Sequence, residues 1–178
     1  MATKKGRHKY YRIPTAAVAH AIEVLQIVAS PRAMVLELAR SPVNPFSFAR
    51  TCYDHLAGRL GVEVTAALRG LDVIRLDNGC YEVTEHGHDW LLEFGIDCQE
   101  LARERRSFAI PCVDFTERRH HIAGTLGAAI LERMVVSNWI ARTRIPRGVR
   151  VTERGKLELA HRLSLEFTNG HGVKYRQQ

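Results

Sequence analysis

The sequence predicts an α+β protein in which an N-terminal strand and helix precede two similar helix–hairpin–helix units. Three observations predict this fold class: a basic opening with alternating side chains, an amphipathic helical pattern after it, and a phrase that occurs twice. With 178 residues, 46% of them hydrophobic, the chain can bury a sizeable core. No apolar run approaches the roughly 18 residues that span a bilayer, and the N-terminus lacks the apolar stretch of a signal peptide. We therefore expect a cytoplasmic protein.

The opening residues 4–13, KKGRHKYYRI, predict a basic β-strand. From His8 onward the side chains alternate, so that Lys9, Tyr11 and Ile13 share one face of the strand. Five basic residues come before the first acidic one and supply most of the formal net charge of +7. Basic residues interleaved with aromatic ones favour contact with phosphates. The alternative is a solvated, disordered basic terminus.

Residues 14–30, PTAAVAHAIEVLQIVAS, predict one amphipathic helix. Pro14 opens it, Val18, Ile22 and Leu25 recur at helical spacing, and Pro31 ends it. A single apolar stripe on an isolated helix requires a partner. Residues 31–50 contain three prolines and no sustained period, and we interpret them as a linker.

Beyond the linker the chain repeats itself. HLAGRLG at 55–61 returns as HIAGTLG at 121–127, and VTEHG at 83–87 returns as VTERG at 151–155. Each copy predicts a helix with an apolar stripe, a hairpin, and a second helix with a threonine N-cap, Thr84 or Thr152. The sequence therefore predicts two tandem winged-helix-like repeats.

Two glycines in each repeated phrase fall inside the predicted helices, namely Gly58 and Gly61, and Gly124 and Gly127. Each costs about 1 kcal/mol relative to alanine in a helix. Glycines three apart lie on one helix face and let another backbone approach, so we expect the two repeat helices to cross here. The alternative is that a turn breaks each phrase.

The phrases GRHKYYRI, RTCYDHLAGRLG and CVDFTERRHHIAGTLG occur in this order. Together they resemble a subgroup of the ArsR-type winged-helix transcriptional regulators, over most of the chain. The resemblance implies a homodimer, paired through the helix at 14–30, that binds double-stranded DNA and acts as a repressor relieved by a signal. It also implies that residues 8–13 are the second strand of a wing. The first strand and the recognition helices would then precede Met1, in a truncated chain whose reading of an operator is in doubt.

The resemblance implies a role for each segment. Residues 1–30 would be the remnant of a DNA-binding domain, 31–50 the linker, 51–165 a tandem-repeat effector or scaffold domain, and 166–178 a flexible tail. The implied DNA-contacting residues in the wing are Lys4, Lys5, Arg7, His8, Lys9, Tyr10 and Arg12.

Soft and nitrogen ligands recur at the two repeat starts. The candidate effector or sensor residues are Cys52, Asp54, His55, Cys112, Asp114, Glu117 and His121. The four cysteines form no CxxC pair, and we expect free thiols. The cysteine and histidine spacings are not those of a standard zinc site, so we expect no cofactor, although the metal question stays open. The favoured interpretation of Cys52 and Cys112 is small buried side chains, and of His55 and His121 hydrogen bonding at the helix starts.

Two other interpretations concern the same region. A small-molecule pocket between the repeats would be lined by Tyr53, Trp90, Phe115 and Trp139. The charged group Asp114, Glu117, Arg118 and Arg119 is better interpreted as a structural salt-bridge network than as a site.

The chain contains no GxSxG, P-loop, HExxH or dinucleotide motif, so we expect no enzyme. The alternative to a transcriptional regulator is a DNA-independent ligand-binding or protein-interaction module whose basic start is incidental.

Overall fold

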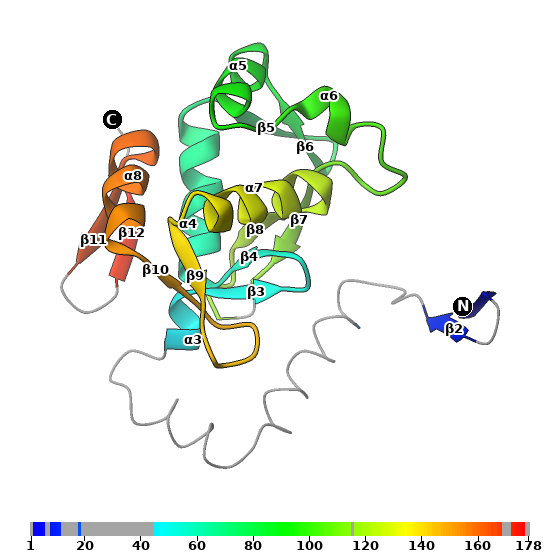
Figure 1. Cartoon of the computed structure of the whole chain (residues 1–178). Coiled ribbons are helices and arrows are strands. Elements are labelled where there is room, and N and C mark those ends of the chain that lie inside the picture. The colour runs from blue at the N-terminus through cyan, green and yellow to red at the C-terminus, as the bar shows by residue number, and fades with distance from the viewer. Residues whose placement is uncertain are drawn as a thin grey trace. The chain divides into compact units, whose positions relative to one another are not determined.

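A computed structural model of the chain describes residues 2–5, 8–11, 18, 45–114, 116–168 and 172–176. They belong to two compact units, Met1–Arg40 and Ser41–Gln178, so that the boundary falls inside the segment interpreted as a linker. The structure mixes helices with small antiparallel hairpins, as expected of an α+β protein (Figure 1). Among the described residues, no helix is both long and apolar enough to cross a bilayer.

The first unit contains a β-hairpin. Strand β1 (Ala2–Lys5) pairs antiparallel with β2 (His8–Tyr11), which confirms the predicted strand over those four residues. The expectation that its partner strand precedes Met1 is wrong. Only Gly6 and Arg7 separate the two strands, and a two-residue connection with glycine is typical of a tight hairpin. The expected pairing helix at 14–30 lies outside the described residues except for Val18, which is helical.

The second unit contains the same succession of elements twice: hairpin, helix, hairpin, helix. The first copy consists of β3 (Arg50–Cys52), β4 (His55–Ala57), α4 (Gly58–Gly70), β5 (Ile74–Asp77), β6 (Cys80–Val83) and α5 (Glu85–Glu93). The second copy consists of β7 (Ile110–Val113), β8 (His120–Ala123), α7 (Gly124–Val136), β9 (Ile140–Arg142), β10 (Val149–Val151) and α8 (Glu153–Leu163). Two short helices, α3 (Pro45–Phe48) and α6 (Cys98–Leu101), precede the first copy and connect the two. The helix–hairpin–helix elements are thus found as predicted, with an additional hairpin in front of each.

The repeated glycine phrase is a strand that runs directly into a helix. Helices α4 and α7 begin at Gly58 and Gly124, which have φ values of +74° and +83°. Only glycine adopts this backbone region readily, so it allows the sharp change from strand to helix. The histidines that were expected at the helix starts therefore lie in strands, and neither a continuous helix nor a helix broken by a turn describes the phrase.

The second glycine of each phrase lies where the helix of one copy packs near the strand of the other. Helix α4 packs against β8 of the second copy, and α7 packs against β4 of the first. A Cβ atom built on Gly61 would lie 2.5 Å from the carbonyl oxygen of Leu56, and one on Gly127 would lie 2.6 Å from that of Ile122. Each glycine therefore makes room for the strand that precedes it in its own copy, with the Cβ of His121 or His55 of the other copy at 3.6 or 3.3 Å. The expected crossing of the two helices at these positions is wrong.

The second half of each copy is built alike. Thr84 and Thr152 cap α5 and α8, and each side-chain oxygen accepts a hydrogen bond from the N–H three residues later, at 2.8 and 2.9 Å. Both predicted N-caps are confirmed.

One hydrophobic core runs through both copies. The predicted stripes are buried in it: Leu56, Leu60, Val64 and Leu68 from the first copy, and Ile122, Leu126, Ile130 and Met134 from the second. Because the copies share this core, neither has a complete core of its own.

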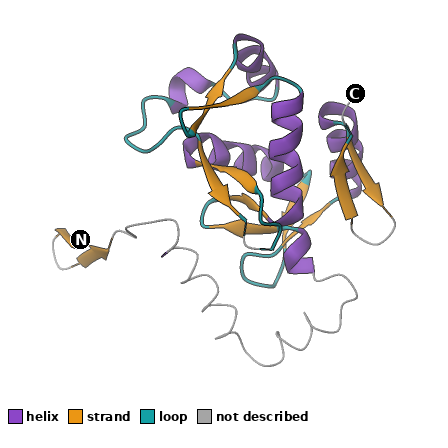
Figure 2. Cartoon of the chain, turned by 180° about the vertical axis from the view of Figure 1, so that it is seen from behind, coloured by secondary structure: helices purple, strands orange, loops and turns teal. Residues whose placement is uncertain are grey.

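The C-terminal end of the described chain is a hairpin. Strand β11 (Leu165–Thr168) pairs with β12 (Gly172–Tyr175), and β12 packs against α4 (Figure 2). The structure therefore corrects the expected flexible tail at 166–178. The physical reason is that alternate residues, Leu165 and Phe167 on one strand and Val173 and Tyr175 on the other, face the core.

Candidate functional site

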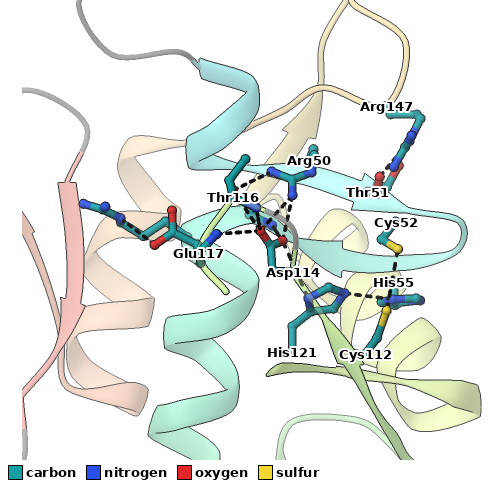
Figure 3. Close-up of polar contacts among 12 residues, drawn as sticks. Arg50, Thr51, Cys52, His55, Cys112, Asp114, Thr116, Glu117, His121 and Arg147 are labelled. Atoms are coloured by element: carbon teal, nitrogen blue, oxygen red, sulfur yellow. Dashed lines mark hydrogen bonds and ion pairs between the residues drawn. The ribbon is translucent and has the colours of Figure 1, made fainter. Parts of the chain in front are cut away.

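Two cysteines and two histidines meet where the first hairpins of the two copies face each other (Figure 3). In the β3–β4 pair Cys52 lies opposite His55, and in the β7–β8 pair Cys112 lies opposite His121. The two Sγ atoms are 3.9 Å apart, and the two histidine Nε2 atoms are 3.1 Å apart. All four ligand atoms lie within 4.8 Å of one another. We call these four residues the Cys–His cluster.

The histidines of the Cys–His cluster are buried, with exposed fractions of 5% for His55 and 1% for His121, whereas both cysteines are half-buried. A hydrogen bond with Cys112 and burial raise the pKa of Cys52 to about 12. The cysteines are therefore more than small buried side chains, because each sulfur faces the other and the imidazoles.

Behind each histidine stands a carboxylate. His55 Nδ1 is 3.3 Å from Asp54 Oδ1, and His121 Nδ1 is 3.7 Å from Asp114 Oδ2. The second distance is too long for a hydrogen bond, and the buried Nδ1 of His121 has no hydrogen-bond partner among the described residues. Each imidazole thus turns Nδ1 toward a carboxylate and Nε2 toward the centre of the cluster.

Asp114 is the polar hub between the two copies. Nη2 of Arg50 donates to both of its carboxylate oxygens, at 2.9 and 2.8 Å, and both side chains are fully buried. The N–H of Gly58 donates to Asp114 at 2.7 Å, so the second copy caps α4 of the first, whose own N-cap residue has no capping side chain. Thr116 and the N–H of Glu117 also donate to this carboxylate.

The pKa of Asp114 reflects these contacts. Burial by itself would raise the pKa of the carboxyl, but the positive charge of Arg50 and the surrounding hydrogen bonds lower it to about 2. Asp114 is therefore a structural anion that holds Arg50 and the start of α4.

Charged residues near Asp114 form further ion pairs between the copies. Glu117 pairs with Arg59 at 3.2 Å, and Arg119 pairs with Glu63 at 2.6 Å. This supports the interpretation of the charged group as a structural salt-bridge network, with the difference that its partners lie in the first copy.

Of the aromatic residues expected around a pocket between the copies, Trp90 and Trp139 both lie against the ring of Phe94, but Tyr53 does not join them. The side chain of Tyr53 is 83% exposed, whereas Trp139 is buried with its ring 4.9 Å from that of Phe94. Phe115 lies outside the described residues. A hollow lies elsewhere, between α4 and the C-terminal hairpin, and its lining includes Glu63, Arg69, Arg119, Lys174 and Tyr175.

A second repeated phrase explains how the Cys–His cluster is assembled. SFARTCYD at 47–54 returns as SFAIPCVD at 107–114, an offset of 60 residues, whereas the two histidines are offset by 66. The difference is the longer β7–β8 connection, which carries Asp114 and Glu117. Sequence analysis missed this phrase, although its cysteine and aspartate recur in register and were the available signal for the site.

The DNA-contacting candidates belong to the separate N-terminal hairpin. Lys4 and Lys5 lie in β1, and His8, Lys9 and Tyr10 lie in β2, with Lys4 opposite Lys9 and Lys5 opposite His8. Arg7 and Arg12 lie outside the described residues.

Comparison with known proteins places the chain among regulators of transcription. It is 40% identical over 165 residues to the HTH-type transcriptional regulator YdfF of Bacillus subtilis (strain 168), a match that covers 92% of this chain and 73% of that protein. No protein-family model and no solved structure matches the chain. The chain therefore belongs to the family of HTH-type transcriptional regulators.

Proposed function

We propose that this protein is an ArsR-like, winged-helix transcriptional regulator that binds double-stranded DNA as a homodimer and acts as a repressor in the cytoplasm. The observation that carries the proposal is the 40% identity to an HTH-type regulator over 92% of the chain. The basic N-terminal hairpin and the repeated CYDHLAGRLG-like phrases support the finer assignment. Its role is to bind rather than to catalyse.

The N-terminal hairpin contacts the DNA backbone in this proposal. The register of its two strands places Lys4 opposite Lys9 and Lys5 opposite His8. Contacts of basic side chains with phosphates position a protein without specifying a base sequence.

The tandem-repeat unit serves as the effector or scaffold domain. A signal relieves repression only if it binds two geometries of the dimer with different affinity. The candidate residues that receive the signal are those at the junction of the two copies, where a small change would alter how the copies interlock.

DNA binding of the full chain tests the proposal. Fluorescence anisotropy with a labelled duplex, measured over a range of salt concentrations, reports the affinity and the number of phosphate contacts. The test variant carries Lys4→Gln, Lys5→Gln and Lys9→Gln. The matched control removes three exposed charges from the β9–β10 region through Arg142→Gln, Arg144→Gln and Arg150→Gln.

We expect the hairpin variant to bind more weakly and its salt slope to fall by up to about 3, since each lost phosphate contact changes the slope by roughly 0.9. The affinity and the salt slope of the control variant should stay closer to those of the wild type. An equal loss of affinity in both variants would contradict a role for the hairpin. A wild-type chain that binds no duplex at low salt would favour the DNA-independent module instead.

A further inference from the structure

We propose that Cys52, His55, Cys112 and His121 bind one divalent cation of the zinc type, which joins the two copies of the repeat. This inference does not rest on DNA binding, because all four residues belong to the second unit and the metal can be measured without DNA.

The sulfur–sulfur and nitrogen–nitrogen separations fit tetrahedral coordination. Zinc bonds of about 2.3 Å to sulfur and 2.0–2.1 Å to nitrogen place two sulfurs about 3.8 Å apart and two nitrogens about 3.3 Å apart. The observed separations are 3.9 Å between Cys52 and Cys112 and 3.1 Å between His55 and His121. In Figure 3 the side chains of the two cysteines and the two histidines point toward one another. The sulfur–nitrogen separations extend up to 4.8 Å, and they would close to about 3.6 Å when a cation binds all four ligands.

The orientation of the histidines also favours a cation. Metal-bound histidines commonly point the second ring nitrogen at a carboxylate, which fixes the tautomer. Asp54 lies 3.3 Å from Nδ1 of His55, and Asp114 lies 3.7 Å from Nδ1 of His121, so Nε2 of each ring faces the other ring at 3.1 Å. A cation between the two nitrogens would replace the proton that they share and would bind both.

The origin of the ligands indicates a structural role for the metal. Each copy supplies one cysteine and one histidine from the two paired strands of one hairpin. Four protein ligands close the coordination sphere and leave no position for a reactive water, as in structural zinc sites. Two thiolates balance the charge of the cation. The metal would therefore clamp the β3–β4 hairpin to the β7–β8 hairpin.

A disulfide is the competing chemistry for the same cysteines. The sulfurs are 3.9 Å apart, compared with about 2.05 Å in a disulfide bond, and both cysteines are thiols in the structure. The geometry therefore favours metal binding over oxidation.

Metal analysis of the full chain tests the proposal. The reduced protein is loaded with Zn²⁺, desalted and analysed for zinc per chain, and a second sample is loaded with Co²⁺ and examined by visible absorption. The test variants are Cys52→Ser, Cys112→Ser and His121→Gln. The matched controls are Cys80→Ser and His120→Gln, which alter an exposed cysteine and an exposed histidine of the same protein.

We expect one zinc per chain in the wild type and in both controls, and loss of stoichiometric binding in each test variant. The cobalt sample should show the visible bands of a tetrahedral ion and the thiolate charge-transfer absorption. Asp54→Asn should bind zinc about 10–100-fold more weakly, as expected when a group that orients a ligand is lost.

A measurement on the wild type alone covers the case in which a variant fails to fold. Bound zinc should protect two thiols from a thiol reagent, and a chelator should expose them while Cys80 reacts in both states. The proposal is overturned by wild-type protein that retains no zinc, by cysteine variants that bind as the Cys80 control does, or by a mass lower by two hydrogen atoms that shows a Cys52–Cys112 disulfide.

Discussion

Replacing Asp114 by asparagine should destabilise the second unit more than any single surface charge does. The carboxylate is fully buried, and it compensates the buried guanidinium of Arg50 at 2.8 Å. Asparagine keeps the shape and one acceptor but removes the charge, so Arg50 is left buried without its counter-charge. Removing one partner of a buried ion pair costs about 3–5 kcal/mol. The loss of charge at the start of α4 acts in the same direction.

Chemical denaturation followed by circular dichroism measures the free energy of unfolding, in buffer with reductant and chelator so that metal binding does not contribute. The matched control is Glu158→Gln, which neutralises one partner of a surface ion pair with Arg162 and should cost only about 0.3–0.5 kcal/mol. The double variant Arg50→Gln/Asp114→Asn removes both charges, and it should be more stable than Asp114→Asn alone.

The pH dependence of this difference has a defined sign. Because the pKa of Asp114 is lowered to about 2 in the folded state, its contribution is fully present at neutral pH and is lost as the pH falls toward that value. The difference in the free energy of unfolding between the wild type and Asp114→Asn should therefore become smaller in acid. If Asp114→Asn lowers the free energy of unfolding at neutral pH by no more than Glu158→Gln does, the assignment of Asp114 as the hub between the copies is refuted.

Three further predictions concern the fold. Gly58→Ala should lower the free energy of unfolding clearly more than Gly79→Ala does, in thermal or chemical unfolding. Both glycines have positive φ, but only a Cβ at Gly58 would meet a carbonyl oxygen, that of Ser47 at 2.8 Å. Equal losses of free energy would contradict the close approach. Thr84→Ala and Thr152→Ala should each lower the free energy of unfolding by about 1 kcal/mol, and Thr→Ser at the same positions should retain most of it. Burial raises the pKa of Cys98, so this thiol should react with a thiol reagent only on unfolding, whereas the exposed Cys80 should react at once; fast labelling of Cys98 in the native protein would show that its helix opens readily.

Local patterns predicted the second half of each copy well. The threonine caps, the apolar stripes and the Asp77–Gly79 turn are all local signals, set by hydrogen bonds or packing within a few residues. The C-terminal hairpin carried an equally local signal, an alternation of Leu165, Phe167, Val173 and Tyr175, that was overlooked.

The start of each copy could not be derived in the same way. HLAGRLG has good helical spacing, and only the positive φ of Gly58, imposed by packing on Ser47 and Phe48, divides it into strand and helix. The interlocking of α4 with β8 is a tertiary contact with no local pattern.

The Cys–His cluster was predicted as a set of residues but not as a geometry. Zinc-site spacings in sequence describe ligands from one compact segment, whereas here the paired ligands come from two hairpins about 60 residues apart. Asp114 was a candidate from the sequence, but its partner Arg50 was not, because Arg50 lay in the segment interpreted as a linker.

X-ray absorption at the zinc edge of the zinc-loaded full chain tests the central claim most directly, because it reports the atoms bound to the metal. The account predicts two sulfur neighbours at about 2.3 Å and two nitrogen neighbours at 2.0–2.1 Å. A shell of oxygen and nitrogen alone, or of four sulfurs, would contradict a cation held between Cys52 and His55 of one copy and Cys112 and His121 of the other.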